Sequence, residues 1–204
     1  MDDDTTAYYR ANAAAFFADT LGVDMAPLYA RFLPLIPVGG QKILDAGCGS
    51  GRDTRAFLDR GYTVTAFDAS AELAALAAAH VGQPVQVLRF QDLEWTQAFD
   101  GIWACASLLH VPATELPDVL SRLARALRPG GVLYASFKFG SGEREYHGRR
   151  FTDLDEAGLA TLLSQVQGLT GLDTWTTGDR RPGRESERWF NALLTTTADA
   201  WSNI

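Results

Sequence analysis

The chain has 204 residues, of which 47% are hydrophobic and 21% charged, and its formal net charge is −7. This size and composition predict one globular domain with an ordinary hydrophobic core. The acidic balance disfavours general binding to nucleic acids or membrane surfaces, since both need a basic surface, and no apolar run approaches the roughly 20 residues of a membrane span. With two cysteines and no signal-peptide pattern, we expect a cytoplasmic setting.

The predicted elements begin with a helix over residues 5–20, after an acidic start at residues 1–4, and a second helix over 25–33 ends at Pro34. Strands and helices then alternate. The expected strands cover 41–46, 62–67, 85–90, 99–104 and 131–137, and the expected helices cover 52–60, 70–80 and 113–127. This alternation predicts an α/β fold with a doubly wound, mostly parallel sheet and right-handed crossovers.

The alternation ends after the last of these strands, and a loop rich in glycine and charged residues is expected through Arg150. A helix near 155–166 follows, and then two strands near 169–176 and 187–196. The turn residues Gly178, Pro182 and Gly183 lie between these strands, so the pair is predicted to form an antiparallel C-terminal hairpin. The expected sheet therefore has seven strands.

We interpret residues 1–204 as a single domain with three parts. Residues 1–38 are expected to form a helical lid, residues 41–137 a cofactor-binding core, and residues 138–204 a substrate-side loop, helix and hairpin.

The most informative stretch, ILDAGCGSGR, runs from Ile43 to Arg52. It combines an apolar strand, three alternating glycines (Gly47, Gly49 and Gly51) and the start of a helix. Glycines let the backbone turn sharply and approach a ligand closely, and the first N–H groups of the helix point toward the turn. The stretch predicts a site for a nucleoside-bearing cofactor.

The spacing of the glycines and the acidic residues near them indicate which class of cofactor the site would bind. Dinucleotide sites use G-x-G-x-x-G, whereas this chain has G-x-G-x-G with Asp45 just before it. Asp68 closes the next strand, and Gln91 and Asp92 follow the one after, at the edge where open α/β sheets bind ligands. Carboxylates suit ribose hydroxyls, an adenine amino group and a cationic amino acid better than they suit pyrophosphate.

Four motifs together resemble class I methyltransferases that use S-adenosylmethionine. The glycine turn resembles their first motif, Asp68 the acid that holds the ribose, and Asp92 the acid that often faces the adenine amino group. Residues 127–133, LRPGGVL, resemble the segment that leads into their fifth strand. The resemblance covers about residues 5–197 and implies an enzyme with the Rossmann-like methyltransferase fold.

Two further segments point to a narrower group. Residues 99–110, FDGIWACASLLH, and residues 179–184, DRRPGR, are similar to a widespread bacterial group described as similar to tellurite-resistance methyltransferases. For that group the fold is well defined and the substrate usually is not.

The resemblance implies where the cofactor is held. Its carboxylate is expected to meet Arg10 or Arg52, and its ammonium the backbone carbonyls near Gly47 and Ala104. Two alternatives stay open, namely that Asp45 only braces the glycine turn and that Arg52 is an exposed residue at a helix start. The whole expected set is Tyr9, Arg10, Asp45, Gly47, Gly49, Arg52, Asp53, Asp68, Ala69, Gln91, Asp92, Leu93 and Ala104.

Three aromatic or titratable side chains are candidates for the reaction itself. Tyr8 and Tyr9 could close over the cofactor, where an aromatic face near a sulfonium gains about 0.5–2 kcal/mol. The alternative is that both pin the helix to the core. His110, just past the fourth strand, is the candidate catalytic base, unless its ring only packs beside its neighbours. Cys48 and Cys105 are expected to be small packed residues, and no metal site is expected.

Basic residues gather on the expected acceptor side of the site. Arginine suits oxyanions and carboxylates, so a small anionic acceptor is favoured. The alternative is neutralisation by glutamates of the same segments, Glu143, Glu145, Glu185 and Glu187. The candidate substrate-binding residues are Lys138, Arg144, Arg149, Arg181 and Arg184.

The sequence thus predicts methyl transfer from S-adenosylmethionine to a small-molecule acceptor by in-line displacement, for which positioning and the exclusion of water are the main tasks. The protein is expected to be a monomer or homodimer, without nucleic-acid or membrane partners. The alternatives are a non-catalytic S-adenosylmethionine-binding regulator and an NAD-dependent oxidoreductase.

Overall fold

A computed structural model describes residues 3–181, 183–184 and 186–196. Four stretches lie outside this range, namely residues 1–2 of the expected acidic start, Pro182, Glu185 and residues 197–204. Seven strands form the central sheet in the order β3-β2-β1-β4-β5-β9-β8. They are β1 (Lys42–Ala46), β2 (Thr63–Asp68), β3 (Gln86–Val87), β4 (Phe99–Ala104), β5 (Leu127–Lys138), β8 (Leu169–Gly178) and β9 (Arg188–Thr196).

Strands β1 to β5 are parallel, whereas β9 runs antiparallel to β5 and β8 antiparallel to β9. The predicted fold class, a mostly parallel seven-stranded sheet with an antiparallel C-terminal hairpin, is confirmed. The helices are α1 (Asp3–Leu21), α2 (Ala26–Phe32), α3 (Arg52–Leu58), α4 (Ala71–Val81), α5 (Leu116–Ala126) and α6 (Glu156–Leu163), with short 3₁₀ turns η1 (Leu33–Leu35), η2 (Phe90–Asp92) and η3 (Leu108–His110).

The core lies in two layers, one on each face of the sheet. Trp103 and Tyr134 point to the face covered by α2 and α3, whereas Ile102 and Leu133 point to the face covered by α5 and α6. All six residues of β4 are buried. A central parallel strand has neighbours on both faces, which explains the apolar run Ile102–Ala104 at its carboxyl end.

Two predicted segments differ from the structure. The strand expected over 85–90 is wrong beyond Val87, because β3 lies at the edge of the sheet with both residues exposed and the backbone then turns into η2. The loop expected through Arg150 is instead a two-stranded antiparallel sheet, β6 (Gly142–Tyr146) and β7 (Arg149–Asp153). The helix predicted over 113–127 begins later, at Leu116.

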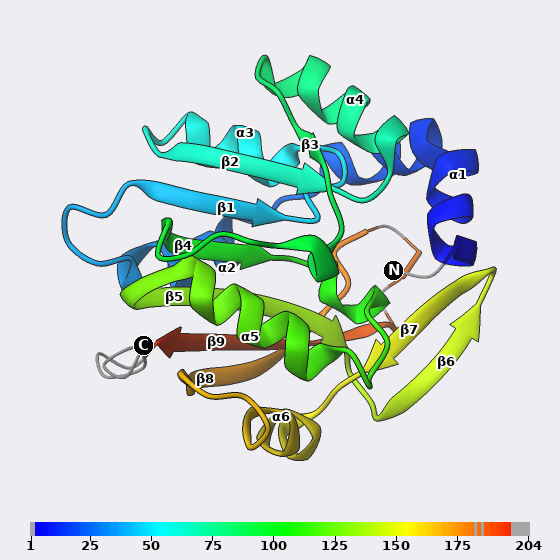
Figure 1. Cartoon of the computed structure of the whole chain (residues 1–204). Helices are drawn as coiled ribbons and strands as arrows, with labels where there is room; N and C mark the ends of the chain where they lie inside the picture. Colours follow the sequence, from blue (N-terminus) through cyan, green and yellow to red (C-terminus); the bar gives the residue numbers. More distant parts are fainter. Residues whose placement is uncertain (1–2, 182, 185, 197–204) are drawn as a thin grey trace.

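The arrangement of these elements defines one functional edge. The carboxyl ends of β1, β2 and β4 point to the same side of the molecule, and α1 and the β6–β7 hairpin lie beyond them (Figure 1). Helix α1 packs on α4 through Tyr9, Ala13 and Leu73. Ligands of open parallel sheets bind at this edge.

Candidate functional site

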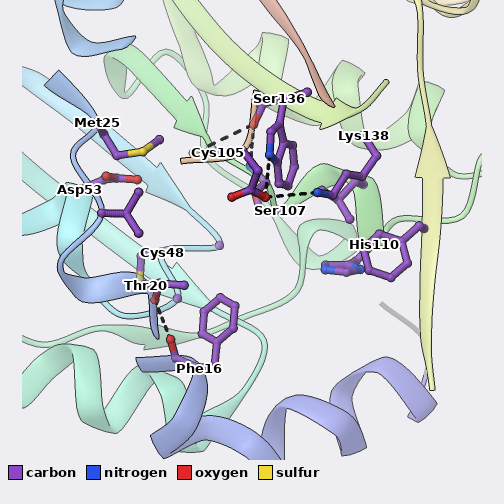
Figure 2. A pocket seen from close by; sticks show the side chains of 18 of the residues that line it. Phe16, Thr20, Met25, Cys48, Asp53, Cys105, Ser107, His110, Ser136 and Lys138 are labelled. Atoms are coloured by element: carbon purple, nitrogen blue, oxygen red, sulfur yellow. Dashed lines mark hydrogen bonds and ion pairs between the residues drawn. The ribbon is translucent and has the colours of Figure 1, made fainter. Parts of the chain in front are cut away.

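A cavity of about 630 Å³ opens at the carboxyl edge of the sheet. One side is formed by the glycine turn, the end of β2 and helix α1, and the other by the β6–β7 hairpin and the β8–β9 connection. Figure 2 shows Cys48 and Asp53 on one side of this space, and Lys138 and His110 on the other. A cavity of this size holds a ligand as large as a nucleoside cofactor.

Bare backbone forms the floor of the cavity at the glycine turn. Gly47 and Gly49 have φ angles of 74° and 56°, which residues with a side chain rarely adopt. A Cβ at Gly47 would lie 2.5 Å from the Cβ of Ser107, and one at Gly49 would lie 3.1 Å from the Phe16 ring. Glycine is therefore required here both by conformation and by space.

Asp68 lies at the end of β2 with 7% of its surface exposed. One carboxylate oxygen accepts a hydrogen bond from the Gly49 N–H and the other from the Ser70 N–H, each at 2.9 Å. Burial raises the pKa of this carboxyl group, and the backbone N–H groups oppose that rise. Each carboxylate oxygen of Asp68 therefore keeps a lone pair for a further hydrogen-bond donor. The next residue, Ala69, also lines the cavity.

Arg52 and Asp53, at the start of α3, form a fixed ion pair in the cavity wall. Asp53 accepts from Arg52 at 2.7 and 2.8 Å, from the Trp103 indole N–H at 2.8 Å and from the Tyr29 hydroxyl. Burial would raise the pKa of Asp53, but these donors hold it below its usual range. Arg52 also donates to the Thr20 carbonyl at 3.3 Å, and its side chain is only 18% exposed. Arg52 is therefore not an exposed helix start.

Asp45 and Ala104 are buried beneath the floor and do not line the cavity. The Thr54 hydroxyl donates to Asp45 at 2.5 Å. Burial, with the nearby charge of Asp53, raises the pKa of Asp45 to about 8. This position agrees with the alternative that Asp45 braces the glycine turn.

Other residues of the expected cofactor set also lie outside the cavity lining. Arg10 pairs with Glu72 at 3.4 Å on the surface, with 67% of its side chain exposed. Asp92 pairs with Arg89 at 3.0 Å, which holds the pKa of Asp92 below its usual range.

Gln91 donates to Glu115, and Leu93 is buried in the core. The wall in this region consists of Leu88, Arg89 and Phe90. The sequence did not indicate these three residues, because it predicted a strand over 85–90, whereas β3 ends at Val87 and η2 begins at Phe90.

Helix α1 covers the cavity beside the glycine turn. Tyr9, Phe16 and Thr20 line it, and Tyr9 is 7% exposed. The Tyr9 hydroxyl lies 2.8 Å from Nε2 of His110. Tyr8 lies beneath the Arg149 guanidinium, 4.3 Å from the ring centroid.

His110 lines the cavity and is held on both ring nitrogens. Nδ1 lies 2.7 Å from the backbone carbonyl oxygen of Arg150. A carbonyl oxygen only accepts, so Nδ1 carries a proton and Nε2 of the neutral ring accepts from Tyr9. The ring also packs against Phe151, with centroids 5.0 Å apart. The ring of His110 therefore lines the cavity and also packs against a neighbour, and its role as a base stays a prediction.

The five basic candidates all line the cavity, but four of them have carboxylate partners. Lys138 contacts Asp179 and Glu187, Arg181 contacts Asp179 at 2.5 Å, Arg144 contacts Asp153 at 2.6 Å, and Arg184 contacts Glu187 at 3.8 Å.

Arg149 differs from the other four. No carboxylate among the described residues forms an ion pair with it, and its Nε is buried without a hydrogen-bond partner. Of the glutamates expected to neutralise these residues, Glu187 pairs with Lys138 and Arg184, whereas the partners of Arg144 and Arg181 are the aspartates Asp153 and Asp179. None of these ion pairs includes Arg149.

Cys48 and Cys105 line the cavity as free thiols. Burial raises the pKa of both, that of Cys105 to about 12, so neither is a ready nucleophile. Within the described ranges no cluster of His, Cys, Asp and Glu is arranged to hold a metal ion. None of the described helices has both the length and the apolar character needed to cross a membrane.

Comparison with known proteins finds similarity to methyltransferases. Residues 43–131 match a family described as a methyltransferase domain. A ubiquinone biosynthesis O-methyltransferase of Xylella fastidiosa is 32% identical over 108 residues, covering 50% of this chain and 43% of that protein. A malonyl-(acyl-carrier protein) O-methyltransferase of Enterobacter lignolyticus is 38% identical over 148 residues, covering 65% and 57%. The chain spans about half the length of the curated relatives it matches.

The fold is similar over nearly the whole chain to a solved enzyme. This is the 1,6-didemethyltoxoflavin-N1-methyltransferase of Burkholderia thailandensis, in a crystal structure with 1,6-didemethyltoxoflavin and S-adenosylhomocysteine bound. The TM-score is 0.70 and the identity 26%, over 94% of this chain and 88% of that one.

Proposed function

Because residues 43–131 match a family described as a methyltransferase domain, we propose that the chain as a whole transfers a methyl group from S-adenosylmethionine to a small molecule. One observation carries the proposal. The buried Asp68 carboxylate stands beside the bare glycine turn, bonded to the Gly49 N–H, in a cavity of about 630 Å³. A ribose with two hydroxyl groups suits an acceptor so placed.

The residues present fit the cofactor from end to end. Asp68 would accept from the ribose hydroxyls, the floor at Gly47 and Gly49 leaves room for close approach, and Arg52 would meet the carboxylate. Leu88 and Phe90 would form the apolar wall beside the adenine. When bound, S-adenosylmethionine supplies a methyl group already activated by the positive charge on sulfur.

The chain's own residues then position the acceptor and exclude water. Tyr9 and Phe16 cover the cavity from α1, and the β6–β7 hairpin covers the acceptor side. Arg149, which has no carboxylate partner among the described residues, supports an acceptor with an anionic or oxygen-bearing group.

We also propose that the chain is related to the bacterial group similar to tellurite-resistance methyltransferases. This relation rests on residues 99–110 and on 179–184, of which the described part includes Arg181 and Arg184 at the cavity. The neutralisation of both arginines makes them supports of the β8–β9 connection rather than free anion-binding groups.

Calorimetric titration with S-adenosylmethionine, S-adenosylhomocysteine and NAD tests the cofactor. We expect the two adenosyl ligands to bind and NAD not to. Asp68→Ala should weaken their binding by about 1–3 kcal/mol, the order expected when hydrogen bonds to a charged group are lost. Asp118→Ala, an exposed acid on α5, is the matched control. Binding of NAD alone would overturn the proposal.

A second measurement distinguishes an enzyme from a protein that only binds the cofactor. The protein is incubated with S-adenosylmethionine carrying a tritiated methyl group and a panel of hydroxyl, amino and thiol compounds. Transfer of tritium to any of them supports an enzyme. Binding without any transfer supports the non-catalytic alternative.

A further inference from the structure

We infer that Tyr9, with His110 behind it and Arg149 beside it, removes the proton from a hydroxyl group of the acceptor, so that this protein methylates oxygen of a phenol or enol. The inference rests on the proposed function and names the accepting atom. It starts from the three side chains themselves, which line one part of the cavity.

The hydrogen bonds around His110 set the direction in which a proton can move. The Arg150 carbonyl at 2.7 Å places the proton of the neutral ring on Nδ1, so Nε2 presents a lone pair that can accept a hydrogen bond. The Tyr9 hydroxyl at 2.8 Å donates to that lone pair. His110 is thus ready to take the Tyr9 proton, and the ring cannot present its other nitrogen without losing the carbonyl.

The surroundings of Tyr9 favour a relay over a stored phenolate. Burial raises the pKa of the Tyr9 hydroxyl, and the Asp68 carboxylate adds to that rise, while the Arg149 guanidinium opposes it. Tyr9 therefore remains protonated at rest. It can accept a proton from a ligand only when its own proton passes to His110.

The step balances in atoms and charge. The acceptor O–H gives its proton to the Tyr9 oxygen, and the Tyr9 proton moves to Nε2 of His110. The acceptor oxygen keeps the electron pair of its O–H bond and forms the bond to the methyl group with it. The pair of the broken methyl–sulfur bond stays on sulfur, so one positive charge leaves the sulfonium and one appears on the imidazolium.

The position of Arg149 favours oxygen over nitrogen as the atom that accepts the methyl group. Its guanidinium lies 4.3 Å from the Tyr8 ring and 5.1 Å from the Phe151 ring, and its Nε is buried without a partner. A fixed cation stabilises an oxyanion as it forms. The same cation disfavours an amine, which gains positive charge during attack, and a carboxylate or chalcogen oxyanion has no proton that a base must remove.

Nitrophenols test the inference without turnover, because their phenolate form is coloured. Protein is saturated with S-adenosylhomocysteine, checked by calorimetry, and then mixed with 4-nitrophenol or 4-nitrocatechol at fixed pH. We expect the phenolate-to-phenol ratio of the bound probe to rise about tenfold, which equals one pKa unit.

The variants assign the effect to the three residues. Tyr9→Phe, His110→Gln and Arg149→Met should each return the ratio toward that of the free probe, while Arg149→Lys should keep part of the rise. His147→Gln and Arg122→Met are matched controls outside the cavity, and retained S-adenosylhomocysteine binding shows that each variant is folded.

The outcomes separate the two proposals. Failure of S-adenosylhomocysteine to bind overturns the proposed function itself. Binding of that ligand with no rise in phenolate for either probe, or with the same rise in all variants, overturns only the inference about oxygen.

Discussion

Asp45 and Asp53 flank the glycine turn, and their environments differ in the number of donors. Asp53 receives hydrogen bonds from Arg52, Trp103 and Tyr29, so its negative charge is compensated. Asp45 receives one side-chain hydrogen bond, from Thr54, and faces the charge of Asp53. Burial and the charge of Asp53, opposed by Thr54 and Arg52, therefore raise the pKa of Asp45 and favour its protonated form.

This difference predicts how stability depends on pH. Burial raises the pKa of Asp45 from 3.8 to about 8, so the folded protein binds more protons than the unfolded chain between these values. The contribution of Asp45 to stability is present below the unfolded pKa and is lost as pH rises through about 8. An asparagine at this position cannot ionise. The unfolding free energy of Asp45→Asn, relative to that of the wild type, should therefore increase as pH rises from about 5 to about 9.

Urea unfolding of both proteins across this range measures the difference. Asp118→Asn, on the exposed face of α5, is the control for replacing a surface carboxylate. A difference between Asp45→Asn and the wild type that does not change with pH would contradict the assignment.

Site residues could be predicted from the sequence when they lie at the carboxyl ends of the parallel strands. Asp68 and Gly49 follow from the rule that ligands meet the carboxyl ends of parallel strands, and both line the cavity. Asp92 follows the same rule but turns to Arg89, because the residues after β3 form a 3₁₀ turn that the sequence does not reveal. The roles of all these residues stay predictions.

At the scale of elements, polar interactions join α1 to η3 and to the β6–β7 hairpin across the cavity. The Thr5 hydroxyl accepts from the Arg150 N–H at 3.0 Å, Tyr9 meets His110, and Tyr8 lies beneath Arg149. All three partners are polar or charged. An element held in this way opens locally at a lower free energy than the core strands.

We expect Thr5→Val to loosen α1 without changing the sheet. Loss of one hydrogen bond, worth about 1 kcal/mol, should speed amide exchange in α1 about fivefold and leave exchange in β4 unchanged. Hydrogen exchange followed by mass spectrometry measures both segments. Thr161→Val on α6, where the hydroxyl donates within its own helix, is the control. Equal acceleration in β4 would indicate global rather than local loosening.

The β6–β7 hairpin shows why one element escaped prediction. All five residues of β6 are exposed, so no alternation of apolar and polar residues marks the strand. The signal present was the turn, His147-Gly148, with φ angles of 50° and 69°, as two-residue hairpin turns require. The buried strands β1, β2 and β4 carry strong apolar patterns, and they were predicted with nearly correct bounds.

At the scale of the whole molecule, the cavity joins segments from both ends of the chain. Helix α1, the glycine turn, the β6–β7 hairpin and the β8–β9 connection all contribute lining residues. The order of the parallel strands follows from alternation and right-handed crossovers, but the meeting of these four segments depends on tertiary contacts that no single segment encodes.

This arrangement predicts that the cofactor stabilises the entire fold. A ligand that binds only the folded state at about 100 times its Kd adds about 2.7 kcal/mol. For a chain of this length each kcal/mol raises Tm by about 2–4 °C, so S-adenosylhomocysteine should raise Tm by about 5–10 °C. Differential scanning calorimetry measures the shift, NAD should give none, and Asp68→Ala should reduce it at the same ligand concentration. An equal shift with NAD would contradict an adenosyl site built around Asp68.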